Sequence, residues 1–131
     1  HMAGQPEHLD NLGRWLDKYP NLYVDTASAK WMARAFSQQK EKAKKFFIKY
    51  SNRVLFGTDM VSGRTDREPL PNYYYNRYLT FQALWETAVE GLKMPIPDPE
   101  NNNETKINGL DLPLNVLKKL YWENGKQLFK F

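Results

Sequence analysis

The stretch "SNRVLFGTDM" (residues 51–60) decides the fold that we expect. A short apolar run at 54–56 leads into Gly57, and a hydroxyl and a carboxylate follow at Thr58 and Asp59. The run predicts a buried strand, and the residues after it predict a turn at the rim of a sheet. Two interpretations of Asp59 are open: an ordinary turn or cap residue, or a catalytic group on the rim of a parallel sheet.

A second strand is predicted upstream in "NLYVDT" (21–26), where apolar residues run into Asp25. Between the two strands, residues 30–50 have helical spacing, with a predicted break near Ser37. Strand, helix and strand in this order are typical of βα units, in which the strands are parallel and the connection is right-handed. We therefore predict an α/β fold with neighbouring parallel strands near 21–26 and 53–58 and with flanking helices.

The rest of the chain completes a single domain over 1–131 without internal repeats. Helices are predicted at 6–18 and in "NYYYNRYLTFQALWETAVEGL", which stops near Gly91. A long loop at 60–71 is a typical place for function, and the proline- and asparagine-rich segment 93–111 is predicted to lie on the surface as an irregular excursion. A last helix starts near Pro113, with these residues facing inward: Leu114, Leu117, Leu120, Tyr121 and Leu128.

Composition excludes several classes of protein. Of 131 residues, 41% are apolar and 15% aromatic, which is typical of a globular chain rather than a disordered one. The absence of cysteine excludes thiolate zinc sites, and no apolar run approaches the roughly 18 residues that span a bilayer. We expect a soluble, cytoplasmic chain without a membrane partner. A net charge of +4 allows a nucleic-acid or other anionic partner but does not demand one. We expect no nucleic-acid partner, and the lysines of 40–49 are typical of a solvated helix face.

Two strands are too few for a stable parallel sheet, because such sheets need both faces covered and their edges protected. Either a further strand precedes residue 5 or another chain completes the structure. The pattern therefore indicates part of something larger.

The longer motifs resemble a known family. "HMAGQPEHLDNLGRWLDKYPNLYVDTAS", "FFIKYSNRVLFGTD", "YYNRYLTFQALWET" and "NGKQLF" are similar to the amidohydrolase-related family of metal-dependent hydrolases and decarboxylases. The resemblance covers nearly the whole chain. It implies the C-terminal half of a (β/α)8 TIM barrel, whose active site lies at the carboxyl ends of the strands.

The same resemblance implies roles for two residues. Asp59, in "FGTD", corresponds to the family's acid/base and metal-binding aspartate, and His1, in "HMAG", corresponds to a metal ligand on a middle strand. The implied cofactor is a divalent metal, zinc or manganese, which suits imidazole and carboxylate ligands. The dipeptide His1-Met2 is also a common remnant of cloning, so both origins stay open.

The chain departs from the family pattern at other ligand positions. The family's first-strand HxH pair is absent, and the second histidine, His8, is predicted to lie exposed in the middle of a helix. Where several members carry a further histidine after the "YVD" strand, this chain has "TASA" at 26–29.

Candidate contacts to a small-molecule substrate lie just past the strand ends, where such contacts gather. Lys30 and Trp31 follow the first strand, and Arg64 lies in the loop after the second. Arg64 would suit a substrate carboxylate, although loop arginines are more often solvated.

Three functions are carried forward. The first is the C-terminal half of a metal-dependent amidohydrolase-type enzyme, with little or no activity as an isolated chain. The alternative is a non-catalytic barrel remnant that forms a homo-oligomer or binds a complementary barrel half. The third is binding of an anionic polymer through the lysines of 40–49.

Overall fold

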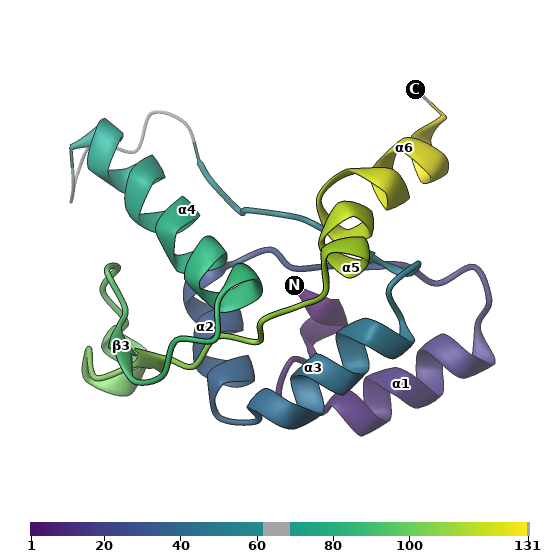
Figure 1. Cartoon of the computed structure of the whole chain (residues 1–131), viewed down its shortest axis with the longest axis horizontal. Helices are drawn as coiled ribbons and strands as arrows, with labels where there is room; N and C mark the ends of the chain where they lie inside the picture. Colours follow the sequence, from purple (N-terminus) through teal and green to yellow (C-terminus); the bar gives the residue numbers. More distant parts are fainter. Residues whose placement is uncertain (62–68, 131) are drawn as a thin grey trace.

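A computed structural model of the chain describes residues 1–61 and 69–130. Arg64 and most of the predicted loop at 60–71 lie outside the described residues. The elements, shown in Figure 1, follow one another in this order: η1 (Met2–Gly4, 3₁₀), α1 (Leu9–Lys18), β1 (Val24–Asp25), α2 (Ala29–Ser37), α3 (Lys40–Lys49), β2 (Val54–Leu55), α4 (Leu70–Glu86), β3 (Leu92–Lys93), η2 (Pro99–Asn101, 3₁₀), β4 (Lys106–Ile107), α5 (Leu114–Lys118), η3 (Lys119–Glu123, π) and α6 (Asn124–Phe129).

The parallel pairing of β1 and β2 is confirmed. Val24 lies opposite Val54, and the amide of Val24 donates to the carbonyl of Arg53 at 3.0 Å. One step further along, the amide of Thr26 donates to the carbonyl of Leu55, also at 3.0 Å. The described residues form this two-stranded sheet and a second one, β3 with β4, so the fold is α/β but no barrel closes within them.

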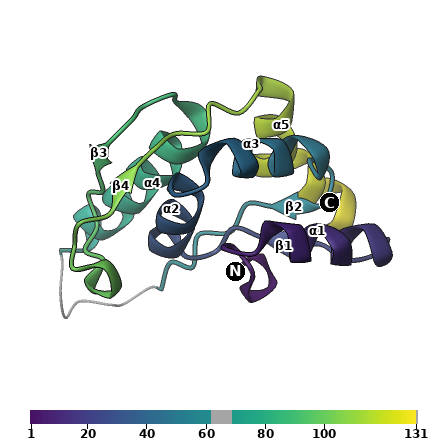
Figure 2. The ribbon, with the colours of Figure 1, turned by 90° about the horizontal axis from the view of Figure 1, so that it is seen from below.

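The outer edge of β2 is covered by the C-terminal helical segment. The amide of Phe56 donates to the carbonyl of Leu120 at 3.0 Å, and Asn124 Nδ2 donates to the carbonyls of Ser51 (2.7 Å) and Val54 (2.8 Å). The wider turn of η3 leaves a helix carbonyl available for such a bond. Figure 2 gives a second view of the sheet, with η1 beside β1. Both edges of the short sheet therefore have neighbours from the chain itself.

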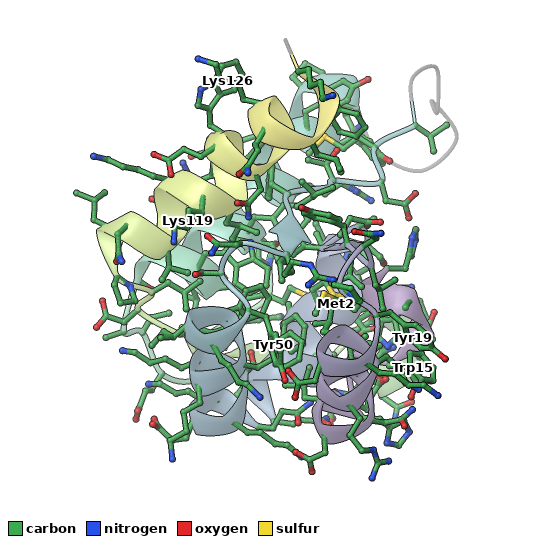
Figure 3. The ribbon with its side chains drawn as sticks, turned by 90° about the vertical axis from the view of Figure 1, so that its right-hand side faces the viewer. Met2, Trp15, Tyr19, Tyr50, Lys119 and Lys126 are labelled. Carbon is green, nitrogen blue, oxygen red and sulfur yellow. The ribbon has the colours of Figure 1, made fainter. Side chains whose placement is uncertain are left out.

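Helices α1 and α3 pack side by side through Tyr50. Its hydroxyl donates to the carbonyl of Gly13 at 3.1 Å, and in Figure 3 its side chain lies between the two helices. Gly13 permits this approach, because a Cβ there would lie 3.0 Å from the Tyr50 hydroxyl. The predicted break near Ser37 is confirmed, since α2 ends at Ser37 and α3 begins at Lys40. The fully buried core between the helices includes Met2, Leu12, Met32, Phe36, Phe47, Phe81 and Trp85.

The lysines of 40–49 are largely paired with acids of other elements. Lys42 and Lys49 reach α1, with these pairs: Lys42–Asp10 at 2.6 Å and Lys49–Asp17 at 3.1 Å. Two more reach the segment after α4: Lys40–Glu90 at 3.2 Å and Lys44–Asp111 at 3.6 Å. The hydrogen bond from Lys49 lowers the pKa of Asp17. This pairing leaves little unbalanced charge on the helix for an anionic polymer.

The prediction that 93–111 lies on the surface as an irregular excursion is wrong. The segment contains the antiparallel pair β3–β4 and the turn η2. Its alternating apolar residues point into the protein, and these are buried: Met94, Ile96, Ile107 and Leu110. The pattern of buried apolar residues was difficult to recognise in the sequence, because prolines and asparagines form the turns between the buried positions.

A buried ion pair joins this segment to α2. Asp98 is fully buried and pairs with Arg34, which is 17% exposed, at 2.5 Å. Asp98 also accepts a hydrogen bond from the Thr105 hydroxyl at 2.6 Å. Glu100 bridges Lys30 (2.8 Å) and Arg34 (2.6 Å), and the hydrogen bonds from these two cations lower its pKa. Asp98 therefore has partners for both of its oxygens, which burial of a carboxylate requires.

One end of each of two predicted helices is corrected. Helix α1 begins at Leu9, so His8 precedes it and is not in mid-helix. Helix α4 ends at Glu86 rather than near Gly91, because residues 109–112 donate amide hydrogen bonds to carbonyls at its end, such as Leu110 to Leu84 at 2.7 Å. Gly109 is required there, since a Cβ would overlap backbone carbonyls of α4.

The inward face predicted for the last helix is only partly correct. Leu120 is 3% exposed, but Leu114 is 67% and Leu128 is 38% exposed. The π-helical turn η3 shifts the facing of residues after it, because it adds a residue to one turn. Asn124 consequently takes a buried position and Leu128 does not.

We predict that Asp98→Ala destabilises the protein by about 3 kcal/mol, because it leaves a largely buried guanidinium with only Glu100 as an acidic partner. Urea unfolding followed by circular dichroism measures the change. The matched control is Glu104→Ala, which removes an exposed carboxylate from the same segment and should cost no more than about 0.5 kcal/mol. Equal unfolding midpoints for the two variants would contradict the anchoring role of Asp98.

Candidate active site

The carboxyl ends of β1 and β2 are joined by the hydroxyl of Thr26. Its Oγ1 accepts a hydrogen bond from the amide of Gly57 at 3.1 Å and donates to the carbonyl of Gly57 at 3.3 Å. Thr26 is fully buried. This bridge continues the strand pairing by one more residue and aligns the two chain segments that follow.

Asp59 lies two residues past this bridge and faces His1. Its Oδ2 is 3.1 Å from His1 Nε2, and both side chains are about half exposed. Asp59 has a left-handed backbone conformation (φ 55°), which aspartate tolerates better than most residues. The structure therefore brings together His1 and Asp59, the two residues to which the family resemblance assigns roles.

Asp25 lies at the end of β1, beside the same histidine. Its Oδ1 accepts the amide of Ala27 at 2.8 Å and pairs with the terminal ammonium of His1 at 2.5 Å. The ammonium also donates to the backbone carbonyl of Asp25 at 3.2 Å, so the backbone of His1 runs along this edge of β1. Gly57 leaves room for the carboxylate, because a Cβ there would come within 3.2 Å of Oδ1.

Trp31 lies next to His1, whereas Lys30 points elsewhere. The rings of Trp31 and His1 are 6.4 Å apart at 52°, and Trp31 Nε1 donates to Glu7 Oε1 at 2.5 Å. Lys30 pairs with Glu100 at 2.8 Å and so belongs to the ion-pair network of α2. Of the two candidate substrate contacts that the structure describes, Trp31 is the one that it brings close to His1.

Comparison with known proteins identifies the family of the chain. A family model described as Amidohydrolase matches residues 1–131, the whole chain. The chain belongs to the amidohydrolase family. This membership gives a hydrolase-type function at a coarse level. No curated protein and no solved structure matches the chain in the corresponding searches.

The donors present match the metal site implied for an amidohydrolase only in part. His1 and Asp59 are of the right types, imidazole and carboxylate, but within residues 1–61 and 69–130 no group of three or more such side chains is close enough to hold an ion. His8 is exposed and lies at the start of α1, and it does not join them. Among the described residues, His1 and Asp59 are thus a pair of suitable donors and not a complete ligand set.

Sequence reasoning missed two features of this candidate site. The hydroxyl of Thr26 was noted only as a replacement for a histidine, although a small hydroxyl residue directly after a strand is a signal for a bond to the neighbouring chain. Glu7 gave no signal, because its partner Trp31 is distant in sequence.

In the described part of the chain, no helix is long and apolar enough to cross a bilayer.

We predict that Thr26→Val lowers the free energy of unfolding by about 1–3 kcal/mol, because it leaves the partly buried polar groups of Gly57 without their partner. Thr26→Ser keeps the hydroxyl and loses one methyl group, which costs about 1 kcal/mol. Urea unfolding ranks the variants, and the amide signal of Gly57 in NMR spectra reports the bond directly. A valine variant at least as stable as the serine variant would show that the bridge does not matter.

Proposed function

We propose that this chain forms the C-terminal half of a metal-dependent, amidohydrolase-type active site on a (β/α)8 barrel. In this proposal Asp59 is the general acid/base and His1 is a metal ligand. The observation that supports it most directly is the 3.1 Å contact of Asp59 with His1 at the carboxyl ends of two parallel strands. Active sites of such barrels lie at this end of the strands.

Each residue has a definite task in this proposal. The carboxylate of Asp59 takes a proton from the attacking water and returns one to the leaving group, or supplies one after decarboxylation. His1 holds one position in the ligand set, and its contact with Asp59 keeps the carboxylate next to that position. A divalent metal such as zinc or manganese, when bound, makes water acidic enough to react near neutral pH.

The remaining ligands come, in this proposal, from strands outside these 131 residues or from a second chain. Two donors bind a divalent ion far more weakly than the three protein ligands of a typical catalytic zinc site. The isolated chain should therefore bind zinc weakly and have little or no hydrolase activity.

The proposal is tested by zinc titration of the chain, with the ring C–H signals of its two histidines followed by NMR. We expect the His1 signals to move while those of His8 stay, and Asp59→Asn to weaken this response by about tenfold or more, since it removes a ligand. The matched control, Asp10→Asn, changes an exposed carboxylate on α1 that pairs with Lys42.

The comparison of variants separates Asp59 from the terminal amine, which can also chelate zinc together with its own imidazole. An unchanged zinc response in Asp59→Asn would exclude Asp59 as a ligand. Zinc-dependent hydrolysis by the isolated chain, lost in Asp59→Asn, would refute the half-site and favour a complete one.

The second candidate function is a non-catalytic barrel remnant that associates with itself or with a complementary half. The exposed Leu114 on α5 and Leu128 on α6 favour it, because these large apolar side chains offer a second chain an apolar surface to bind. The outer edge of β2 does not favour it, since a strand added there must displace the contacts of Leu120 and Asn124.

Self-association through this apolar face predicts a dimer in sedimentation at tens of micromolar protein. Leu114→Asp should then dissociate the dimer, because it places a charge on the face, whereas Asn115→Asp on the same helix should not. A monomer in all three samples would contradict this candidate.

A further inference from the structure

The ring of Trp31 is held in place by the side chain of Glu7. We propose that Glu7 is a positioning residue that fixes Trp31 as a wall of the His1–Asp59 site, and that a flat, unsaturated group of the substrate packs against this wall. The inference rests on the proposed function, because it assumes that chemistry takes place at His1 and Asp59.

Glu7 belongs to a turn whose place relative to His1 is fixed by several contacts. Pro6, its neighbour, is buried, and its carbonyl accepts a hydrogen bond from Gln39 Nε2 at 2.7 Å. Met2 is fully buried, and Asn11 Nδ2, from α1, donates to Gln5 Oε1 at 2.9 Å. The carboxylate of Glu7 therefore starts from a rigid base.

Trp31 comes from the first turn of α2, directly after the end of β1. Its neighbour Met32 is fully buried and fixes the backbone there, while Trp31 itself is partly exposed. The indole N–H meets the Glu7 carboxylate at 2.5 Å, a bond in which the acceptor carries a charge and which is stronger than a neutral one. This bond restricts rotation of the ring, which lies 6.4 Å from the ring of His1.

A fixed indole ring next to the reacting groups selects by shape. Tryptophan offers a large, rigid apolar surface, and flat unsaturated groups pack on such a surface better than puckered saturated ones of equal size. A ring that rotated freely would lose conformational entropy on each binding event, so its fixation favours binding. Glu7 acts on the substrate only through Trp31.

The positioning role is tested by NMR on the whole chain. The indole N–H signal of Trp31 is assigned from Trp31→Phe. Glu7→Ala should move this signal to the frequency of a solvated indole and shift the His1 ring signals, because the ring current of Trp31 changes. Glu7→Gln keeps an acceptor and should restore both, while Glu41→Ala, at an exposed acid on α3, should change neither.

Unmoved His1 ring signals in Glu7→Ala would overturn the positioning role, even if the hydrogen bond were lost. A Glu7→Gln variant with the same signals as Glu7→Ala would also overturn the positioning role.

The preference for a flat group is tested with two neutral amides of similar size, benzamide and cyclohexanecarboxamide. Titration with benzamide should shift the Trp31 indole and His1 ring signals at concentrations at least about threefold below those needed for the saturated analogue. The difference should disappear in Trp31→Ala and shrink in Glu7→Ala. Equal responses to both amides, or no response to either, would overturn the preference.

These outcomes are separable from the test of the proposed function, because none of them requires metal or turnover. If Asp59→Asn leaves zinc binding unchanged while Glu7→Ala releases the ring of Trp31, the proposed metal site is refuted and the role of Trp31 as a wall is retained. If Asp59→Asn weakens zinc binding as expected and Glu7→Ala has no effect on Trp31 or His1, the positioning role of Glu7 is refuted and the proposed metal site is retained.

Discussion

The parallel register of β1 and β2 is the constraint on which the site depends. Val24 opposite Val54 brings the carboxyl ends of both strands to one edge, and the Thr26 hydroxyl extends the pairing to Gly57. Arg53 secures the other end, since its guanidinium donates to the carbonyls of Tyr19 and Leu22 before β1. A shift by one residue would turn every side chain of a strand to its opposite face and separate the acids that follow.

So short a sheet persists because other parts of the chain replace the missing strands. On the β2 side, Leu120 and Asn124 supply an acceptor and a donor to the backbone. On the β1 side, η1 (Met2–Gly4) lies against the strand. Backbone groups at a sheet edge need partners, and an unpaired edge promotes aggregation. The contacts that protect the sheet therefore also bring His1 to the site.

The sequence was sufficient to predict the elements that local residues determine. It was insufficient where contacts between distant residues determine the structure. Apolar periodicity gave both strands and the break near Ser37, because these depend on neighbouring residues, and the order strand, helix, strand gave the parallel pairing. It failed at 93–111, where a buried carboxylate, Asp98, depends on Arg34 of a distant helix. It predicted that Asp59 ends a strand at the rim of the sheet, whereas the approach of His1 was expected only through the family resemblance.

The two acids at the edge differ in what their oxygens can still do. Asp25 Oδ1 accepts a hydrogen bond from the amide of Ala27 and pairs with the ammonium of His1, so N–H donors already occupy this oxygen. Among the described residues, the partner that the structure gives Asp59 is an imidazole nitrogen, which leaves its carboxylate able to accept a proton or a cation. In the proposed function, this difference gives Asp25 a structural role and Asp59 the acid/base role. That division follows from the donors around each carboxylate, because both side chains are about equally exposed.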